Sequence, residues 1–575
     1  MSLSIDKSKD GYNIVQVNIE NKKQYIGSKY NQKREIDNFV KGFKNCTIND
    51  NYIVFGLSLG EHIVELLKKV SCKSHVLIIE INDELIEYYE SYNDVNNILK
   101  NPRIELARNA DEVKSFFRKY ITKVNINNLE IGYYARYEKM YSGKLNDIYE
   151  TIKNESERII SDKNTSLYFG ADWFNSLLVN LKYMAKGLPV NDFKDKYKNI
   201  PAIIVSAGPS LERNVDELKG IKNSLILTGG RTLGTLIERQ IEPTCLCVVD
   251  PGEVSYKLVE NYIDKVKCPL VFYEGTNSKV VQKHNGKKIF SANNKFISDV
   301  WKEEIQSLSG GGSVAHAMTI LAAYMGCSPV VFIGQDLAYT EEKGHATCSE
   351  NKWQKLTFDD YKRSDDLYVE DINGELVRTS IVLNSYRLAM EEIIEAFPNT
   401  RFINATEGGA NIKGTENKTL KDTINDFKDN NISELEKFFK TDDKTQDFIN
   451  GLKKNIKLLE QDISLCSKGE HILEDFKINY HLNKQSRINK NLKDLDDIDY
   501  KLRNNINDIN IINSILFNTI YEIENNDEFL INMSDDKEVA FNKNINKNRA
   551  IYCGLKETMK ICYEKLRVAV KELEY

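Results

Sequence analysis

PAIIVSAGPSL, residues 201–211, is the stretch that decides the fold of this 575-residue chain. Residues 202–205 form a short apolar run rich in β-branched side chains, which is typical of a buried strand. Residues 206–210 (SAGPS) break that run, and Leu211 begins a segment with helical spacing of its apolar residues. A strand, a glycine-containing turn and a helix start form a common phosphate cradle, because free backbone N–H groups and the helix dipole both favour an anion there.

Two residues of this turn are candidates for contact with a ligand. Gly208 carries no side chain, so a phosphate can approach the backbone closely. Ser210 can cap the helix that follows or donate a hydrogen bond to a phosphate oxygen. A plain strand–helix joint would show the same sequence, so the turn alone does not decide the function.

The same pattern of an apolar run and a polar turn recurs along the chain. Because these predicted strands alternate with stretches long enough for helices, the sequence predicts a parallel sheet with helices on both faces. Ligands bind such sheets at the carboxyl ends of the strands. The further runs are 224–228, 244–249, 270–273, 329–333 and 401–404, and the candidate nucleotide- and sugar-binding residues at their ends are Thr228, Gly229, Arg231, Asp250, Glu274 and Gln335.

A second glycine-rich turn, residues 310–313 (GGGS), precedes an apolar segment of helical character at 314–325. The glycines leave the backbone bare, so a phosphate or a ligand backbone can come close. The serine stands at the expected N-cap position. His316, one turn into the helix, is either a contact to a phosphate or base or a satisfied buried histidine, and the sequence leaves both open. The candidate contacts here are Gly311, Gly312, Ser313 and His316.

A dense polar cluster follows at residues 334–346 (GQDLAYTEEKGHA). Asp336 stands at a predicted strand end, and Tyr339 and His345 follow on the loop. A carboxylate, a phenol and an imidazole on one loop can serve acid–base catalysis. His345 is the best candidate for proton transfer, because the ordinary pKa of histidine lies near neutrality. A solvated loop with an Asx turn is the alternative interpretation.

The overall composition excludes some classes of protein. Lys and Arg number 79 against 85 Asp and Glu, a net charge of −6, which argues against a general nucleic-acid binder. The first residues are polar and no apolar run reaches about 18 residues, so we expect no membrane span and a cytoplasmic location. The ten cysteines include no CxxC pair. Cys245 and Cys247 alternate along a predicted strand and are expected to be buried thiols rather than a metal site.

The sequence predicts an α/β fold in several parts. The N-terminal part contains predicted strands at 51–55 and 75–81, a glycine-containing turn, and a helix at 61–70. Glu80 follows Gly60 by twenty residues, which resembles a dinucleotide-binding fingerprint with one glycine missing and the wrong spacing. Either a ligand site or a purely structural Rossmann-like domain explains this pattern. The predicted divisions are a Rossmann-like domain at 1–110, a helical connecting region at 111–200, a central α/β domain at 201–410 and a helical domain at 411–575.

Two helical regions carry further expectations. In the connecting region, helices are predicted at 147–160 and 175–184, with Trp173 and Phe174 as core residues before the second one. In the C-terminal region, apolar residues from Leu495 to Leu516 repeat at spacings of three and four, interrupted by Asn505. This pattern indicates a helical bundle or coiled coil. It is either a partner-binding appendage or a structural bundle without a partner.

Several of these motifs together resemble the motility accessory factor (Maf) family of flagellin glycosyltransferases. The similar stretches are GPSL (208–211), VVDP (248–251), GGSVAHAMTILAAYMGC (311–327) and GQDLAYT with a following HA (334–346). The segment SKYNQKRE (28–35) also resembles that family, so the similarity spans most of the chain. The motifs are specific as a set, although no single one is.

The resemblance implies a fold and an activity. It implies a Rossmann-like N-terminal domain, a central sialyltransferase-like parallel α/β domain and a C-terminal helical bundle that engages flagellin. The implied reaction transfers a nonulosonic acid, of the pseudaminic or legionaminic acid type, from its CMP-sugar to a Ser or Thr hydroxyl of flagellin. Flagellum assembly and motility would depend on this reaction.

The resemblance also implies roles for individual residues. Sialyltransferase-like sites usually work without a bound metal, so hydrogen-bond donors must offset the charge of the departing CMP. Ser313 and Tyr339 are expected near the phosphate, and Asp250 and Asp336 are expected to hold the sugar, the ribose or the acceptor. His345 would be a general base toward the acceptor or a general acid toward the phosphate. A divalent metal is not expected, but Asp250 and Asp336 are the carboxylates expected to hold one.

Two alternatives stay open. The central domain is also similar to an archaeal pterin diphosphokinase-like domain, which implies ATP preference and Mg²⁺ dependence, although the sequence contains no GxxxxGK[ST] loop. A non-catalytic flagellin-binding protein is the other alternative, in which the α/β domains are only a scaffold.

Overall fold

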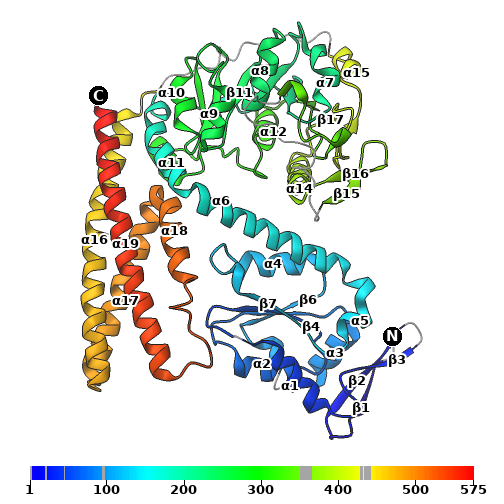
Figure 1. Ribbon diagram of the computed structural model, residues 1–575, viewed down its shortest axis with the longest axis vertical. Coiled ribbons are helices and arrows are strands. Elements are labelled where there is room, and N and C mark those ends of the chain that lie inside the picture. Colours follow the sequence, from blue (N-terminus) through cyan, green and yellow to red (C-terminus); the bar gives the residue numbers. More distant parts are fainter. Residues whose placement is uncertain are drawn as a thin grey trace. The chain divides into compact units, whose positions relative to one another are not determined.

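The computed structural model describes residues 3–19, 22–44, 46–92, 97–349, 366–427, 432 and 442–575. The chain is an α/β protein with parallel sheets and a helical C-terminal region, as predicted (Figure 1). It divides into two compact units. Unit 1 comprises Met1–Tyr168, Leu465–Ile498 and Leu516–Glu557, and unit 2 comprises Phe169–Ser464, Asp499–Ile515 and Thr558–Tyr575.

Unit 1 contains two sheets. A small antiparallel sheet consists of β1 (Ser4–Lys7), β2 (Asn13–Ile19) and β3 (Lys22–Ile26), and a four-stranded parallel sheet has the order β6-β5-β4-β7. The first of the two predicted N-terminal strands coincides with β4, and the second with β5 to within two residues; the other strands were not predicted. The parallel strands are β4 (Asn51–Phe55), β5 (Val76–Ile79), β6 (Ile104–Ala107) and β7 (Leu129–Tyr133), and the helices around them are α1 (Gln32–Gly42), α2 (Glu61–Lys69), α3 (Asp83–Tyr92), α4 (Ala110–Tyr120) and α5 (Tyr137–Tyr141).

Protein side chains fill the glycine-containing turn that follows β4. Gly56 and Gly60 both have positive φ angles, which glycine adopts without strain. A Cβ atom at Gly56 would lie 3.0 Å from the Tyr137 ring, and one at Gly60 would lie 2.8 Å from the Tyr89 ring. The space beside these glycines is therefore occupied by tyrosines of the same unit.

The acid of the fingerprint-like pattern is also engaged by protein. Glu80 is fully buried at the end of β5. Its carboxylate accepts hydrogen bonds from the N–H groups of Leu57 and Asn82, both at 3.0 Å, and from the Tyr137 hydroxyl at 2.9 Å. A carboxylate so engaged does not face a ribose, and these contacts favour the structural interpretation of this domain. His62 is likewise a buried packing residue, with its ring stacked on Tyr134 at 3.6 Å.

Unit 2 is built on a nine-stranded sheet in which every pairing is parallel, in the order β18-β17-β14-β9-β10-β11-β12-β13-β8. The predicted strands at 202–205 and 270–273 coincide with β9 and β12, and the other four predictions differ by at most two residues at either end. The strands are β8 (Leu188–Pro189), β9 (Ala202–Val205), β10 (Leu225–Gly229), β11 (Cys245–Cys247), β12 (Leu270–Tyr273), β13 (Lys288–Ser291), β14 (Val330–Ile333), β17 (Phe402–Asn404) and β18 (Glu416–Asn417).

Helices cover both faces of this sheet, so its central strands are buried throughout. Cys245 and Cys247 are buried free thiols, as predicted. The helices are α7 (Leu211–Asn214), α8 (Gly230–Glu238), α9 (Glu253–Val259), α10 (Ser278–Lys283), α11 (Lys295–Trp301), α12 (Val314–Tyr324), α14 (Ile381–Ala396) and α15 (Leu420–Asn425), with a hairpin of β15 (Leu367–Glu370) and β16 (Leu376–Thr379) before α14.

The order of the strands reverses at one place in the sheet. From β9 the chain builds outward through β10, β11, β12 and β13, and it then returns to place β14 on the other side of β9. The reversal between β9 and β14 is a topological switch point, where open parallel sheets form their ligand crevice. The turns that follow these two strands contain Gly208 and Asp336.

The helical regions differ from the prediction in two respects. The two helices predicted in the connecting region are one continuous helix, α6 (Asn146–Met184), which contains Trp173 and the fully buried Phe174. The predicted apolar repeat from Leu495 to Leu516 is not one helix, because α17 (Gln485–Asp508) ends inside it and a 3₁₀ turn follows. Its residues Ile498, Leu502, Ile509, Ile512 and Leu516 are buried, as a bundle pattern predicts. The remaining long helices are α16 (Thr445–His481), α18 (Asn513–Glu524) and α19 (Lys537–Glu574). Among the described residues, no helix combines the length and apolar character needed to cross a bilayer.

The burial of Glu80 predicts a pH-dependent stability of unit 1. Burial raises its pKa from 4.5 to about 7, although its hydrogen bonds oppose this shift. The folded state therefore binds more protons than the unfolded state between these two values, so stability falls as the pH rises through this range. Between pH 5 and pH 8, we expect the natural protein to lose about 2 to 3 kcal/mol more unfolding free energy than Glu80→Gln, measured by urea titration. Parallel pH profiles for the two proteins would contradict this account.

Candidate functional site

The candidate site lies at the carboxyl edge of the unit 2 sheet, beginning at the switch point. The Gly208 N–H donates to the Gly334 carbonyl at 2.7 Å, which joins the turn after β9 to the turn after β14. A Cβ atom on Gly208 would overlap the Asp336 carboxylate and would lie 2.5 Å from the Gly334 carbonyl oxygen. Only glycine fits this close approach of the two turns.

Asp336 holds the turn after β9 in place. It is buried, and its carboxylate accepts hydrogen bonds from the Ser210 hydroxyl at 2.8 Å and from the Ser210 N–H at 3.2 Å. Burial raises the pKa of Asp336, while contacts with Thr340 and Ser210 oppose that shift. The predicted roles of Ser210 need correction, because its backbone is helical rather than that of an N-cap and its hydroxyl is committed to Asp336.

Two helices start at the end of β10. Helix α8 begins at Gly230, and no side chain caps it. A Cβ atom on Gly229 would lie 3.0 Å from Val314, the first residue of α12, so both helix starts lie at the same strand end. Helix N-termini carry partial positive charge and present N–H groups, so this edge favours an anionic ligand. Thr228, by contrast, is buried and shares a hydrogen bond of 2.8 Å with Thr232.

The start of α12 is closed by its own residues. The Ser313 hydroxyl accepts a hydrogen bond from the Ala315 N–H, as its predicted N-cap position requires. His316 is fully buried; its Nδ1 accepts from the Ser313 N–H at 3.2 Å and its Nε2 donates to the Tyr386 carbonyl at 2.9 Å. Burial lowers the pKa of this imidazole. His316 is therefore a satisfied capping residue, and of its two predicted interpretations the structural one holds.

The three glycines before α12 differ in their surroundings. A Cβ atom at Gly310 or Gly311 would lie within 3.0 Å of packed side chains. At Gly312, which has a φ of +77°, the nearest atom would be in the Tyr386 ring at 3.5 Å. Gly312 therefore offers more room for a ligand than its two neighbours. Tyr386 on α14 was not predicted, because a tyrosine on a distant amphipathic helix carries no local signal.

His345 approaches the same edge from the loop after β14. The Ala346 N–H donates to the Ala207 carbonyl at 3.0 Å, which fixes the loop beside the turn after β9. Burial, and after it the positive charge of Arg231, lower the pKa of His345 to about 4. The imidazole is thus neutral at physiological pH, so it can accept a proton but has none to donate as an acid, and its lowered pKa makes it a weaker base than an ordinary histidine.

Carboxyl groups of two kinds follow β11 and β12. Asp250 is exposed, although the protein around it withdraws enough water to raise its pKa. Burial, and after it the charge of Asp250, raise the pKa of Tyr386, which places these two side chains within electrostatic reach. Glu274 is buried and accepts hydrogen bonds from the Asn293 N–H at 3.1 Å, and burial raises its pKa to about 7.

The predicted residues thus separate into two groups. Those with solvent access at the carboxyl edge are Gly208, Arg231, Asp250, Gly311, Gly312, Ser313 and His345. Those buried behind it are Ser210, Thr228, Gly229, Glu274, His316, Gln335, Asp336 and Tyr339. The Arg378 guanidinium lies 4.1 Å from the centre of the Tyr339 ring, so this phenol is part of the packed wall. The described residues contain no group of three or more His, Cys, Asp or Glu side chains placed to hold a metal ion.

Parts of this chain, and its fold as a whole, are similar to known proteins. Residues 175–342 match the family described as 6-hydroxymethylpterin diphosphokinase MptE-like. A protein of Treponema pallidum (strain Nichols) described as uncharacterized is 19% identical over 202 residues, which is 34% of this chain and 68% of that protein. The Maf glycosyltransferase of Magnetospirillum magneticum AMB-1 superposes with a TM-score of 0.59 at 13% identity, over 100% of this chain and 93% of that chain. This likeness shows a shared fold.

The close approach at Gly208 generates a stability prediction. Gly208→Ala should lower the unfolding free energy of unit 2 by about 2 to 4 kcal/mol, because the added methyl group overlaps the Asp336 carboxylate. Gly143→Ala is the control, since a Cβ atom there meets nothing within 4 Å. The two variants are compared by urea unfolding, and equal effects would show that the two turns are not tightly joined.

The environment of His345 generates a titration prediction. In histidine-labelled protein, we expect its ring signal in NMR spectra to stay that of the neutral form at pH 6 and above. Arg231→Gln should move the pKa of His345 upward toward its ordinary value of 6.5, because one cause of the lowering is removed. An unchanged pKa of His345 in this variant would show that the charge of Arg231 does not act on it.

Proposed function

We propose that this protein is a glycosyltransferase whose nucleotide-activated donor binds at the carboxyl edge of the unit 2 sheet. The observation that carries the proposal is the meeting of two features suited to a phosphate at the end of β10. These are the uncapped start of α8, with Arg231 in its first turn, and the open space beside Gly312 before α12. A fold shared over the whole chain with a Maf glycosyltransferase supports sugar transfer as the chemistry.

The donor we propose is a CMP-activated nonulosonic acid of the pseudaminic or legionaminic acid type. Such a donor carries a phosphate and a sugar carboxylate, so it presents two anions to the edge. Backbone N–H groups at the uncapped start of α8 and the Arg231 guanidinium would stabilise the negative charge that develops on the departing CMP phosphate. Gly312 would allow the phosphate to approach the backbone.

The acceptor we propose is a Ser or Thr hydroxyl of flagellin. In the transfer step, the hydroxyl oxygen bonds to the anomeric carbon while the bond from that carbon to the CMP phosphate oxygen breaks. His345, neutral at physiological pH, would take the hydroxyl proton. Asp250, the exposed carboxylate of the edge, would orient the sugar or the acceptor. The reaction would take place in the cytoplasm and would serve flagellum assembly and motility.

Phosphoryl transfer is the second candidate function. The match of residues 175–342 to the pterin diphosphokinase-like family favours it, and that match contains the same glycine turns and Arg231. An ATP-dependent enzyme would bring Mg²⁺ bound to the nucleotide phosphates, with Asp250 as the accessible carboxylate. This candidate therefore requires a metal-dependent affinity for ATP at the same edge.

Calorimetric titration with CMP and with ATP, each with and without Mg²⁺, tests the proposal. We expect CMP to bind without Mg²⁺, and Arg231→Gln and Gly312→Val to weaken it about tenfold or more, because a cation or the space for the phosphate is lost. Gly220→Val is the matched control, since Gly220 has a φ of +76° against +77° at Gly312 and an open environment.

The outcomes separate the candidate functions. Mg²⁺-dependent binding of ATP, with no binding of CMP, would contradict sugar transfer and favour phosphoryl transfer. Equal loss of CMP binding in Gly220→Val and Gly312→Val would place the nucleotide elsewhere. Silence with both nucleotides, together with flagellin binding, would favour a non-catalytic flagellin-binding protein.

A further inference from the structure

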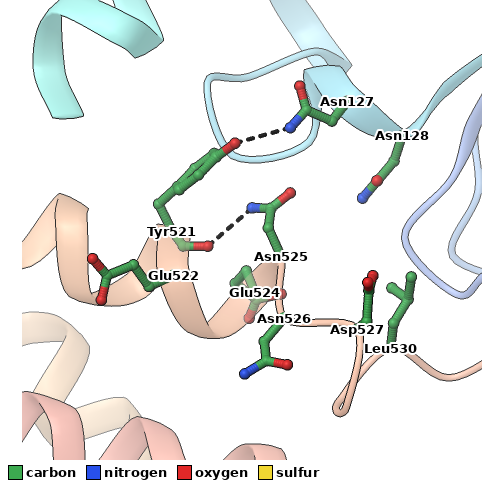
Figure 2. Close-up of a pocket in the computed structure, with 9 residues that line it drawn as sticks. All are labelled: Asn127, Asn128, Tyr521, Glu522, Glu524, Asn525, Asn526, Asp527 and Leu530. Atoms are coloured by element: carbon green, nitrogen blue, oxygen red, sulfur yellow. Dashed lines mark hydrogen bonds between the residues drawn. The ribbon is translucent and has the colours of Figure 1, made fainter. Parts of the chain in front are cut away.

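Unit 1 contains a pocket of about 500 Å³ that none of the preceding functions uses (Figure 2). One wall is the turn before β7, with Asn127 and Asn128. The other wall is the end of α18 and the chain that follows it. The residues of this second wall are Tyr521, Glu522, Glu524, Asn525, Asn526, Asp527 and Leu530.

Part of this lining forms a fixed frame. The Asn127 amide donates to the Tyr521 hydroxyl at 2.9 Å, and its carbonyl oxygen accepts from the Lys163 ammonium at 3.0 Å (Figure 2). The Asn525 amide donates to the carbonyl oxygens of Val124 and Tyr521 at 3.1 and 3.0 Å. Since these bonds use the amide hydrogens of Asn525, its side-chain oxygen is left as an acceptor.

The remaining groups define the chemistry that would fit. Glu524 is neutralised by Lys547 at 2.6 Å. Asn128 and Asp527 point toward one another across the opening in Figure 2, while Glu522 lies at its outer side. Carboxylate and amide oxygens around one opening match a guanidinium group, which carries five N–H donors in a plane. Leu530 adds apolar surface of the kind that the methylene stem of an arginine covers.

The pocket lies at the start of an open sheet edge. Asn128 directly precedes β7, which stands at the end of the order β6-β5-β4-β7 and has no strand on its outer side among the described residues. The Tyr134 N–H donates to the Phe55 carbonyl of β4. Because backbone groups of successive residues alternate in direction along a parallel strand, those of Ile131 and Tyr133 point outward.

The outer edge also combines apolar and acidic character. Ile131 and Tyr133 are 42% and 39% exposed, which is unusual for large side chains on an unprotected edge strand. Glu130 is exposed between Asn128 and Ile131, and the carboxylates of Glu522 and Asp527 lie at the strand's beginning. An extended segment could pair with the outward backbone groups, cover the apolar side chains and bring a positive charge to this acidic end.

We propose that unit 1 binds an extended, basic protein segment that adds to the outer edge of β7 and places one arginine side chain in the pocket beside Asp527. Main-chain hydrogen bonds to Ile131 and Tyr133 would supply affinity, and the arginine would set the register. This site is separate from the nucleotide edge and does not depend on the proposed glycosyl transfer.

The test uses the full-length protein and a panel of fluorescein-labelled ten-residue peptides. Each peptide alternates threonine and valine and carries one arginine, whose position changes from peptide to peptide. A second panel carries glutamine in place of arginine. We expect at least one arginine peptide to bind with a Kd of about 10 to 500 μM by fluorescence anisotropy, and its glutamine counterpart to bind about tenfold more weakly.

Three protein variants locate the binding. Asp527→Asn should weaken the arginine peptide about fivefold or more and leave the glutamine peptide unchanged, because only the charge is removed. Ile131→Pro should weaken the binding of both peptides, because proline removes the outward N–H of residue 131. The hydrogen bonds between β7 and β4 do not use this N–H and stay in place. Glu87→Gln, an exposed charge of unit 1 outside the pocket, is the control and should change neither.

Several results would overturn the proposal. Failure of every arginine peptide to bind would overturn the proposal, as would binding that Ile131→Pro leaves intact. A dimer in analytical ultracentrifugation that dissociates in Ile131→Pro would assign the edge to a second copy of this chain instead. CMP binding measured on the same variants should stay unchanged, so a failure here is distinguishable from a failure of the nucleotide proposal.

Discussion

The hydrogen bonds from Ser210 to Asp336 are the interaction on which the candidate site depends. They join the turn after β9 to the turn after β14, the two strands between which the sheet reverses its order. A topological switch point normally opens a crevice at this place. Here the two turns are packed against each other through Gly208, so the edge open to a ligand shifts toward the end of β10, where α8 and α12 begin.

Polar residues at the strand ends of both units have two different roles. Asp336, Glu274 and Glu80 are buried carboxyl groups that accept hydrogen bonds from backbone N–H groups, and burial raises the pKa of each. Such groups fix loops, because an unpartnered buried carboxylate would be costly. Asp250 and His345, in contrast, keep access to solvent. Some polar residues at a strand end therefore fix the loops, and others face the solvent where a ligand would bind.

The sequence predicted the central sheet well because its strands are short, buried and followed by turn residues. It did not predict β8, β13 or β18, which lack a clear apolar run. Ser210 and His316 could not be assigned from sequence, since their partners, Asp336 and the Tyr386 carbonyl, are distant in the chain. Glu80 looked like a ribose-binding acid because spacing does not show that a tyrosine hydroxyl already occupies it. Local sequence patterns predicted the helices and strands, whereas contacts between distant parts of the chain determine the roles of individual residues.

The most direct test of the account is hydrogen–deuterium exchange of the whole protein with and without CMP. We expect slower exchange in peptides that contain Arg231 and Gly312, because the backbone N–H groups of these two turns would bind or enclose the phosphate. The glycine turn at Gly56 and Gly60 should be unaffected, since tyrosines fill it. Protection at that turn, with no change at the edge of the unit 2 sheet, would contradict the account.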